Sequence, residues 1–388
     1  MNENSQDLDC LAGIRVVDFT QFEAGTSCTE ALAWLGADVV KIENPKTGDP
    51  GRRLRPGKPD DDPWYFHMFN ANKRSLAINL KSPRGVAIVK EMLKKADVTV
   101  ENMAPGTIER LGLGYDEVKK INPRIIFCQI QGFGTGSKYE TGLAFDMIAQ
   151  AAGGTISVTG EPDRPPVKPG PSFGDTGTGR RLQVAMQDAM IHYMRTCFAT
   201  QARTGKAAPR RGAKTVAGTN SPSGLYQCKP LGSNDWIYIT TSRGNPEHWG
   251  RLMKLIGREE LIDDPRFATG AARVQHEAEV DAIITEWTRQ HTKEEAMTLI
   301  SGVGVPAGAV FDTMELQNDP SFEKRGIMQV MEHPNGPFKM PTWPVRVDGK
   351  TARLKPSPLL GQHGADVLNT WLGIGADEIA ALKSEAVL

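Results

Sequence analysis

The stretch "PSFGDTGTG", residues 171–179, holds one carboxylate, Asp175, among small and turn-forming residues. The glycines on either side allow a tight backbone and the nearby threonines add little bulk, so the carboxylate can be approached from one side. A carboxylate presented in this way can act as a nucleophile, forming an acyl-enzyme that divides one difficult transfer into easier steps. A turn-forming or helix-capping aspartate would leave the same pattern. Composition alone does not choose between the two interpretations.

A second candidate is the turn after the first predicted strand, "FTQFEAGTSCTEA", residues 19–31. Its small residues Ala24, Gly25, Thr26 and Ser27 stand at a helix start, where backbone N–H groups can bind an anion or a nucleotide. The turn lacks GxGxxG, and the chain contains no GxxxxGK[ST] P-loop, so a dinucleotide site would rest on fold class alone. An ordinary strand-to-helix turn explains the same residues.

Basic and amide side chains fall near other predicted strand ends, namely Asn72, Lys73, Arg74, Asn102 and Arg110. In an open parallel sheet the carboxyl ends of the strands face the ligand crevice, and "ENMAPG" stands at such an end. These groups therefore become candidate ligand contacts, although each taken singly could also be a solvated surface group.

Composition excludes several other classes of function. Lys and Arg, 46 in total, balance 46 Asp and Glu, which argues against a nucleic-acid-binding protein. The seven histidines show no metal-ligand spacing, and the five cysteines are scattered, as expected for reduced thiols. The start of the chain has no signal-peptide pattern and no stretch approaches a membrane span, so we expect no membrane contact and a cytoplasmic location.

Strands and helices must alternate to position these residues. Short β-branched runs are expected to form strands at 14–19, 38–43, 74–80, 97–103 and 124–133, with helices at 28–36 and 83–96. Continuous apolar strands between helices predict an α/β fold whose parallel sheet is covered on both faces.

The second half of the chain predicts a smaller unit. Residues 182–202 look helical over most of their length, and the polar connector 203–224 marks a boundary. Beyond it, a strand at 236–241 and helices at 246–257, 279–290 and 293–304 indicate an α+β unit. We therefore expect a large Rossmann-like domain at 1–205, a small domain at 222–325, and a C-terminal segment, 326–388, that returns to the large domain.

Motifs spread over almost the whole chain resemble the class III coenzyme A transferase family, which includes formyl-CoA transferases, carnitine-type CoA-transferases and α-methylacyl-CoA racemases. They are "LAGIRVVDFTQFEAG", "ALAWLGADVVKIENPKTGDPGR", "FNANKRSLAINLKSPRG", "ADVTVENMAPGTIERLGLGYDEVKKINPRIIFCQIQGFG", "FDMIAQAAGG", "TGEPDRPPVKPG" and "GDTGTG". The resemblance implies a homodimer whose two chains interlock. It also implies acyl-CoA and organic carboxylate substrates, with no permanently bound cofactor and no metal.

The resemblance also assigns the site. Asp175 stands where the family keeps its catalytic aspartate, with Gln21 as a second catalytic residue. The implied mechanism passes through a mixed anhydride and an aspartyl-CoA thioester. CoA contacts are implied at Glu23, Ala24, Ile78, Asn79, Leu80, Lys81, Asn102, Met103, Arg110, Gly142, Leu143, Ala144 and Phe145.

Three departures from relatives bear on specificity. The similar racemases place a histidine at position 145, where this chain has Phe145, and an apolar side chain cannot relay a proton, so a transferase is favoured. Formyl-CoA transferases carry an arginine where this chain has Asn44. The loop "GTNSPSG", 218–224, differs from the glycine-rich cover of relatives, which argues against formyl-CoA and oxalate as substrates.

One departure concerns activity itself. Relatives insert a helix and a turn between "GDTGTG" and "VAMQDA", whereas here Gly179 is followed almost at once by "RRLQVAMQDA". A catalytically impaired CoA-binding homologue and a racemase therefore stand as alternatives to the transferase. The acceptor acid is open, because Tyr226, Trp236 and Trp249 could suit a bulky or aromatic acid but are explained equally well by core packing.

Overall fold

A computed structural model describes residues 5–54, 62–134, 136–137, 140, 142, 144–176, 183–216, 218–241 and 245–388. The chain divides into two compact units. Unit 1 comprises Met1–Gly154, Gly170–His192 and Asp319–Leu388, and unit 2 comprises Thr155–Pro169 and Tyr193–Asn318. The domain bounds expected from the sequence stay a prediction.

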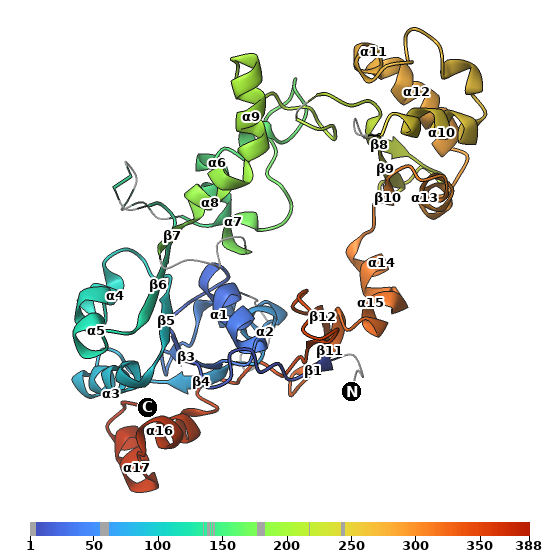
Figure 1. The fold of residues 1–388 in the computed structure, drawn as a ribbon. Coiled ribbons are helices and arrows are strands. Elements are labelled where there is room, and N and C mark those ends of the chain that lie inside the picture. The colour runs from blue at the N-terminus through green and yellow to red at the C-terminus, as the bar shows by residue number, and fades with distance from the viewer. Residues whose placement is uncertain are drawn as a thin grey trace. The chain divides into compact units, whose positions relative to one another are not determined.

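A six-stranded parallel sheet is the centre of unit 1, with the strand order β4-β3-β2-β5-β6-β7 (Figure 1). The strands are β2 (Arg15–Asp18), β3 (Asp38–Glu43), β4 (Arg74–Ala77), β5 (Val98–Glu101), β6 (Ile126–Gln131) and β7 (Gln183–Ala185). The predicted α/β fold with a parallel sheet is confirmed. The strand order reverses between β2 and β5, which makes the crevice beyond their carboxyl ends the expected ligand site.

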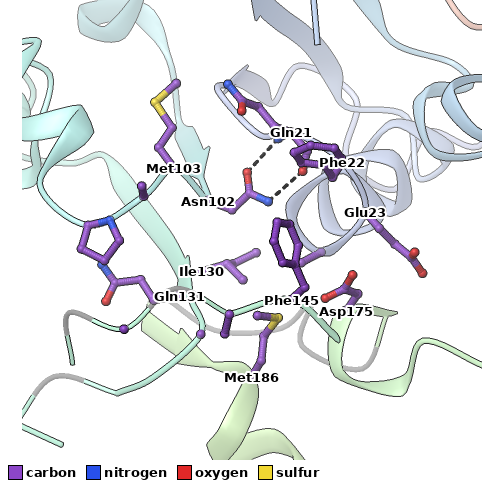
Figure 2. Close-up of a pocket in the computed structure, with 16 residues that line it drawn as sticks. Gln21, Phe22, Glu23, Asn102, Met103, Ile130, Gln131, Phe145, Asp175 and Met186 are labelled. Carbon is purple, nitrogen blue, oxygen red and sulfur yellow. Dashed lines mark hydrogen bonds between the residues drawn. The ribbon is translucent and has the colours of Figure 1, made fainter. Parts of the chain in front are cut away.

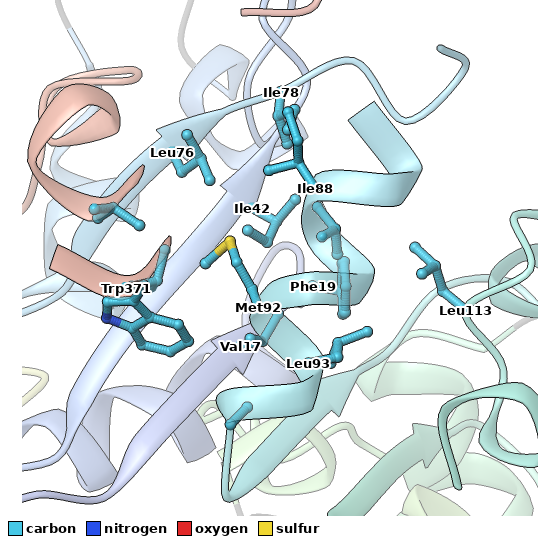
Figure 3. Packing of buried hydrophobic residues seen from close by; sticks show 14 of the residues in the cluster. Val17, Phe19, Ile42, Leu76, Ile78, Ile88, Met92, Leu93, Leu113 and Trp371 are labelled. Carbon is cyan, nitrogen blue, oxygen red and sulfur yellow. The ribbon is translucent and has the colours of Figure 1, made fainter. Parts of the chain in front are cut away.

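Helices cover both faces of the sheet. On one face lie α3 (Pro83–Lys95), α5 (Tyr115–Ile121), α16 (Gly364–Leu372) and α17 (Ala376–Ser384). Their apolar side chains pack on Val17, Ile42 and Leu76 of the strands, and Figure 3 shows Met92 of α3 and Trp371 of α16 within this core. The other face is covered by α1 (Ala24–Trp34), α6 (Asp146–Ala152) and α8 (Met186–Tyr193).

Helix α3 shows why these residues form these elements. Pro83 fits the first turn, where its missing N–H is not needed, and Ile88, Val89, Met92 and Leu93 are all buried on one stripe of the helix. The helix predicted at 83–96 is thus confirmed.

The helix predicted over 182–202 begins too early. Gln183–Ala185 form strand β7, which pairs with β6, and the chain then makes α8 and, after a break at Met194, α9 (Arg195–Thr204). Residues 183–185 pair with β6, and this pairing overrides their local helical pattern. The local pattern could not show it, because β6 is distant in the sequence.

Unit 2 is built on the antiparallel sheet β10-β9-β8. Its elements are β8 (Ser223–Gln227), β9 (Trp236–Thr240), β10 (Ala307–Ala309), η2 (Ile156–Val158), α9, α10 (Glu247–Ile256), η3 (Glu259–Leu261), α11 (Gly270–Gln275), α12 (Glu277–Thr288), α13 (Lys293–Gly302) and α14 (Thr313–Asn318). Tyr226 and Trp249 are each 2% exposed within its core, so core packing, and not contact with an acceptor acid, explains both.

The remaining elements belong to unit 1. They are β1 (Ser5–Gln6), η1 (Pro50–Arg53), α2 (Trp64–Asn70), α4 (Thr107–Arg110), α7 (Phe173–Thr176), α15 (Pro320–Lys324), β11 (Met328–His333), β12 (Gly336–Pro341) and β13 (Thr351–Ala352). Among the described residues, no helix combines the length and the apolar character that crossing a bilayer requires.

Candidate active site

A pocket of about 260 Å³ opens in unit 1 at the carboxyl ends of β2, β5 and β6 (Figure 2). It therefore lies at the point where the strand order reverses. Its walls are formed by Gln21, Phe22, Glu23, Ala24, Asn102, Met103, Ala104, Pro105, Ile130, Gln131, Gly132, Gly142, Ala144, Phe145, Asp175 and Met186.

Asn102 joins the two loops that flank this reversal. Its side-chain carbonyl accepts the backbone N–H of Gln21 at 2.7 Å, and its amide nitrogen donates to the backbone carbonyl of Gln21 at 2.8 Å. Figure 2 shows both bonds. Because both main-chain groups of Gln21 are bound, the backbone of the loop at Gln21 is held against the loop at Asn102.

The turn at Gln21 is tight on the other side as well. Phe22 adopts a positive φ of 59°, and its N–H donates to Asp49 at 3.2 Å. A Cβ at Gly25 would stand 2.4 Å from the Thr20 methyl group and 3.1 Å from Cγ of Asn102. No other residue type fits at Gly25 without moving the turn.

Fully buried ion pairs, Asp18 with Lys73 and Lys41 with Asp49, hold this turn in place. The Asp18 carboxylate accepts from the Thr20 N–H at 2.8 Å and lies 3.2 Å from the Lys73 ammonium. Lys41 pairs with Asp49 at 2.7 Å and donates to the Thr20 carbonyl at 2.8 Å. Although burial alone would raise it, Lys73 and Lys41 hold the pKa of Asp18 below its usual value.

A further buried carboxyl stands at the end of β5. Glu101 is 1% exposed, and one of its oxygens accepts the N–H of Met103 at 2.8 Å. Burial raises the pKa of Glu101 to about 7. Near neutrality this carboxyl is therefore on the border of ionisation, directly next to Asn102.

Asp175 is brought to the pocket by α7, which packs against α1 and α6. Gln150 of α6 fixes the chain entering α7, because its amide donates to the carbonyl of Pro171 at 3.2 Å. Asp175 is half-buried, and the carboxylate of Glu23 lines the same pocket. Burial raises the pKa of Tyr65, and the negative charges of Glu23, Asp175 and Asp49 raise it further.

Two aromatic rings form an apolar part of the pocket wall. Phe22 and Phe145 meet edge to face, with ring centroids 6.0 Å apart. Phe145 is 58% exposed and lies near Asp175 in Figure 2. An apolar ring therefore stands beside Asp175 in this part of the wall.

Most of the predicted site residues meet in this pocket. Those that line it are Asp175, Gln21, Glu23, Ala24, Asn102, Met103, Gly142, Ala144 and Phe145. Leu143 lies outside the described residues. The structure thus brings together residues separated by more than a hundred positions in the sequence.

The predicted contacts at Ile78, Asn79, Leu80 and Lys81 do not line it. They follow β4 at the same edge of the sheet, two strands from β2, which corresponds to roughly 10 Å. Ile78 is fully buried in the core, so its side chain is closed to a ligand, whereas Lys81 is exposed.

Arg110 also lies outside the pocket wall. It is exposed at the end of α4, where it donates to the Thr107 hydroxyl at 2.9 Å. The loop that leads into α4 supplies Ala104 and Pro105 to the pocket. The contact of Arg110 with CoA stays a prediction.

The expectation for residues 72–74 is wrong. Asn72 and Lys73 precede β4 and Arg74 is its first residue, so all three lie at its amino end and not at the carboxyl end that faces the crevice. Lys73 is bound to Asp18, and Arg74 pairs with Asp38 and Asp366. The sequence showed the charges but not their partners, which are distant in the chain.

Asn44 has a local role. Its side-chain oxygen accepts the N–H groups of Lys46 and Thr47, at 2.9 and 3.2 Å, and so closes a turn after β3.

Sequence reasoning missed part of the wall, namely Phe22, Ala104, Pro105, Ile130, Gln131, Gly132 and Met186. The end of the strand "RIIFCQIQGF" could have indicated Gln131 and Gly132, since parallel strands open the crevice at their carboxyl ends. Met186 carried no such signal because it follows the unpredicted strand β7.

The chain belongs to CoA-transferase family III. The family model matches residues 11–179 and 175–364. The two matched segments overlap at 175–179, immediately before the place where this chain is expected to lack a helix of its relatives.

Curated relatives and solved structures agree with this assignment. A formyl-CoA:oxalate CoA-transferase from Streptomyces avermitilis is 37% identical, over 97% of this chain and 99% of the relative. The enzyme of the same name from Escherichia coli O6:H1 is 35% identical, over 96% of this chain and 98% of the relative. The crystal structure of a CAIB/BAIF family protein from Brucella suis has a TM-score of 0.80 and 29% identity, covering 94% of this chain and all of that one.

Proposed function

We propose that the protein moves coenzyme A from an acyl-CoA donor to an organic carboxylate, with Asp175 as the nucleophile. The observation that carries this proposal is the convergence of Asp175, Gln21 and Asn102 on one pocket at the reversal of the strand order. Membership of CoA-transferase family III supports the reaction class.

The proposed reaction begins when an Asp175 oxygen attacks the thioester carbon of the donor. The C–S bond breaks, CoA leaves as a thiolate, and a mixed anhydride remains on Asp175. The thiolate then attacks the aspartyl carbonyl and displaces the donor acid, giving an aspartyl-CoA thioester. The acceptor carboxylate attacks this thioester, so its C–S bond breaks, CoA leaves again as a thiolate, and a second anhydride forms. The thiolate then attacks the acceptor's acyl carbon, which gives the new acyl-CoA and restores Asp175.

Each step places negative charge on a carbonyl oxygen, which a fixed donor can stabilise. The Gln21 side-chain amide is our candidate for that donor, since its main-chain groups are bound by Asn102. The Phe22 and Phe145 rings would shield the anhydride from water.

The substrates are proposed only by class. The names of the curated relatives make formyl-CoA and oxalate the first pair to test. The loop at 218–224 predicts that this pair is not the preferred one.

We also propose a homodimer. Unit 1 exposes apolar side chains around the pocket and on α6, α7 and α8, namely Phe145, Met147, Ile148, Phe173 and Ile191. A partner surface that covers them would remove apolar area from water. Light scattering on the purified protein tests this state, and a monomer at micromolar concentration would contradict it.

Trapping the acyl-enzyme tests the proposed function. Hydroxylamine added with an acyl-CoA is expected to inactivate the wild type by converting Asp175 to a hydroxamate, which mass spectrometry detects on that residue. Asp175→Ala should lose transfer by at least 10³-fold, a magnitude typical of a lost nucleophile. Asp377→Ala, an exposed aspartate at the start of α17, is the control. Full transfer by Asp175→Ala would disprove the assignment.

A catalytically impaired homologue is the second candidate, because the chain lacks the helix that relatives place after the "GDTGTG" motif, and the family match falls into two segments that overlap at 175–179. Such a protein would bind CoA without turnover over a panel of donors and acceptors, and robust CoA exchange would eliminate it. A racemase is disfavoured by Phe145, and deuterium wash-in at Cα without an acceptor acid would be needed to support it.

A further inference from the structure

Unit 2 contains a second pocket, of about 360 Å³, formed entirely within that unit. Its wall includes Asn220, Ser221, Thr241, Gly270 and Arg273. The volume suits a small molecule. The reaction steps proposed at Asp175 use none of these side chains, although Asn220 and Ser221 belong to the loop 218–224 that bears on substrate preference.

The pocket holds a buried cation, Arg273, that has no counter-charge among the described residues. Arg273 is 8% exposed, and no carboxylate in the described part of the chain forms an ion pair with it. Burial without such a partner lowers the pKa of Arg273. A buried guanidinium normally finds an acidic partner, because removing it from water is costly.

The guanidinium is held in place by neutral groups. Its Nε donates to the carbonyl of Ser221 at 2.8 Å, and its Nη1 donates to the carbonyl of Phe267 at 2.5 Å. The guanidinium carbon, Cζ, lies 4.9 Å from the centre of the Trp249 ring. Nη2 makes no bond to a described residue that would compete with a ligand, so the fork is oriented in advance and its charge is open to an anion.

Two oxygen atoms in the wall are buried without a partner among the described residues, namely Oγ of Ser221 and Oδ1 of Asn220. Ser221 is 1% exposed. Buried polar atoms in proteins are nearly always bonded, so these two imply a ligand or water in the pocket. A hydroxyl group suits both, because it can donate to Oδ1 and accept from the Ser221 hydroxyl.

We propose that this pocket binds a small hydroxycarboxylic acid, whose carboxylate pairs with Arg273 and whose hydroxyl group bonds to Ser221 and Asn220. A carboxylate matches the planar guanidinium fork. The inference does not depend on catalysis by Asp175, so binding and not turnover tests it.

The test uses lactate, propionate and inorganic phosphate as probes in calorimetric titrations of the full-length protein. Gly270→Asp places a carboxylate beside the guanidinium, because a Cβ at Gly270 would lie 3.8 Å from Nη2 of Arg273 and meet nothing closer. Gly302→Asp adds the same charge in α13 of the same unit, where a Cβ meets no atom within 4 Å. Thermal scans of both variants would check that they fold.

Lactate should bind the wild type and Gly302→Asp equally, and Gly270→Asp at least tenfold more weakly. Propionate, which lacks the hydroxyl group, should bind the wild type about tenfold more weakly than lactate, a difference typical of lost hydrogen bonds. Ser221→Ala leaves Arg273 in place. It should bring the ratio of the propionate to the lactate dissociation constant towards one.

Equal lactate binding by the two glycine variants would overturn the proposal, and so would the absence of saturable binding. Phosphate binding tighter than that of lactate, and lost only in Gly270→Asp, would show an anion site but contradict the carboxylate class.

Discussion

Asn102 binds both main-chain polar groups of Gln21, at 2.7 and 2.8 Å, and thereby joins the loops after β2 and β5. The contact joins the side chain of Asn102 to the backbone of Gln21, so the Gln21 side chain takes no part in it. The geometry of the proposed oxyanion donor is therefore set by a residue 81 positions away in the sequence.

Asn102→Ala should separate the two loops. The loss of both bonds leaves the Gln21 N–H and carbonyl unpaired in a half-buried place, at a cost of about 1–3 kcal/mol of unfolding free energy. Transfer should fall by roughly 10²-fold, because small displacements of catalytic groups have effects of that size. Urea denaturation and steady-state kinetics measure the two effects.

Asn369→Ala is the matched control, because that amide is exposed and makes a single long contact of 3.4 Å to Ile374. A change of less than about 0.5 kcal/mol is expected for it. If Asn102→Ala and Asn369→Ala changed the unfolding free energy and the transfer rate by the same amount, the bonds between Asn102 and Gln21 would have no role.

Glu101 should give the protein a pH-dependent stability. Its pKa of about 7 in the folded state lies above the value of 4.5 for an unperturbed glutamate, so the folded state holds a proton that the unfolded state releases between these values. Stability contributed by this group is full below pH 4.5 and is lost as the pH rises to 7. Over this window it lowers the unfolding free energy by about 1.4 kcal/mol per pH unit.

Glu101→Gln cannot titrate, so its unfolding free energy should fall less steeply than that of the wild type between pH 5 and 7. Denaturation at several pH values checks this slope, and Glu286→Gln, at an exposed position of α12, should keep the slope of the wild type. A slope in Glu101→Gln identical to that of the wild type would contradict the assigned titration.

Lys73→Met should be strongly destabilising. It removes the ammonium from Asp18 and leaves a fully buried carboxylate without its nearest cation, which typically costs 3–5 kcal/mol. Urea denaturation measures the loss. The double variant Asp18→Asn/Lys73→Met should recover part of it, because no uncompensated charge then remains.

Arg84→Met provides the comparison, since Arg84 pairs with Glu378 and Glu385 at the surface. Exposed ion pairs contribute less than about 1 kcal/mol. A loss in Lys73→Met no larger than that in Arg84→Met would mean that the charges beneath the turn do not support it.

Gly25→Ala tests the tight turn. The new methyl group would start 2.4 Å from Cγ2 of Thr20, so the turn must shift, at a typical cost of 1–3 kcal/mol for overpacking. CoA binding, followed by calorimetry, should weaken at the same time. Gly308→Ala, where a Cβ meets no atom within 4 Å, should leave both properties unchanged.

Much of this arrangement follows from local sequence. The opening strands and helices, including β3 and α3, carry strong periodic patterns, and the structure confirms them. The turn at Gln21 and the loop at Asn102 could be predicted to meet because parallel strands end at one edge of the sheet.

The rest depends on contacts that no local pattern encodes. Lys73 looked like a ligand group and proved to be bound to Asp18, 55 positions earlier. Strand β7 looked helical from its own residues, since its partner β6, which makes it a strand, precedes it by about fifty residues. Burial and pairing of this kind are decided by the tertiary structure and override local propensity.

The contact between Asn102 and Gln21 uses only backbone atoms on the Gln21 side. The side chain at position 21 can therefore be replaced without breaking the bonds that hold the loop. Variants at this one position can separate the proposed chemistry of the Gln21 amide from the stability of the scaffold.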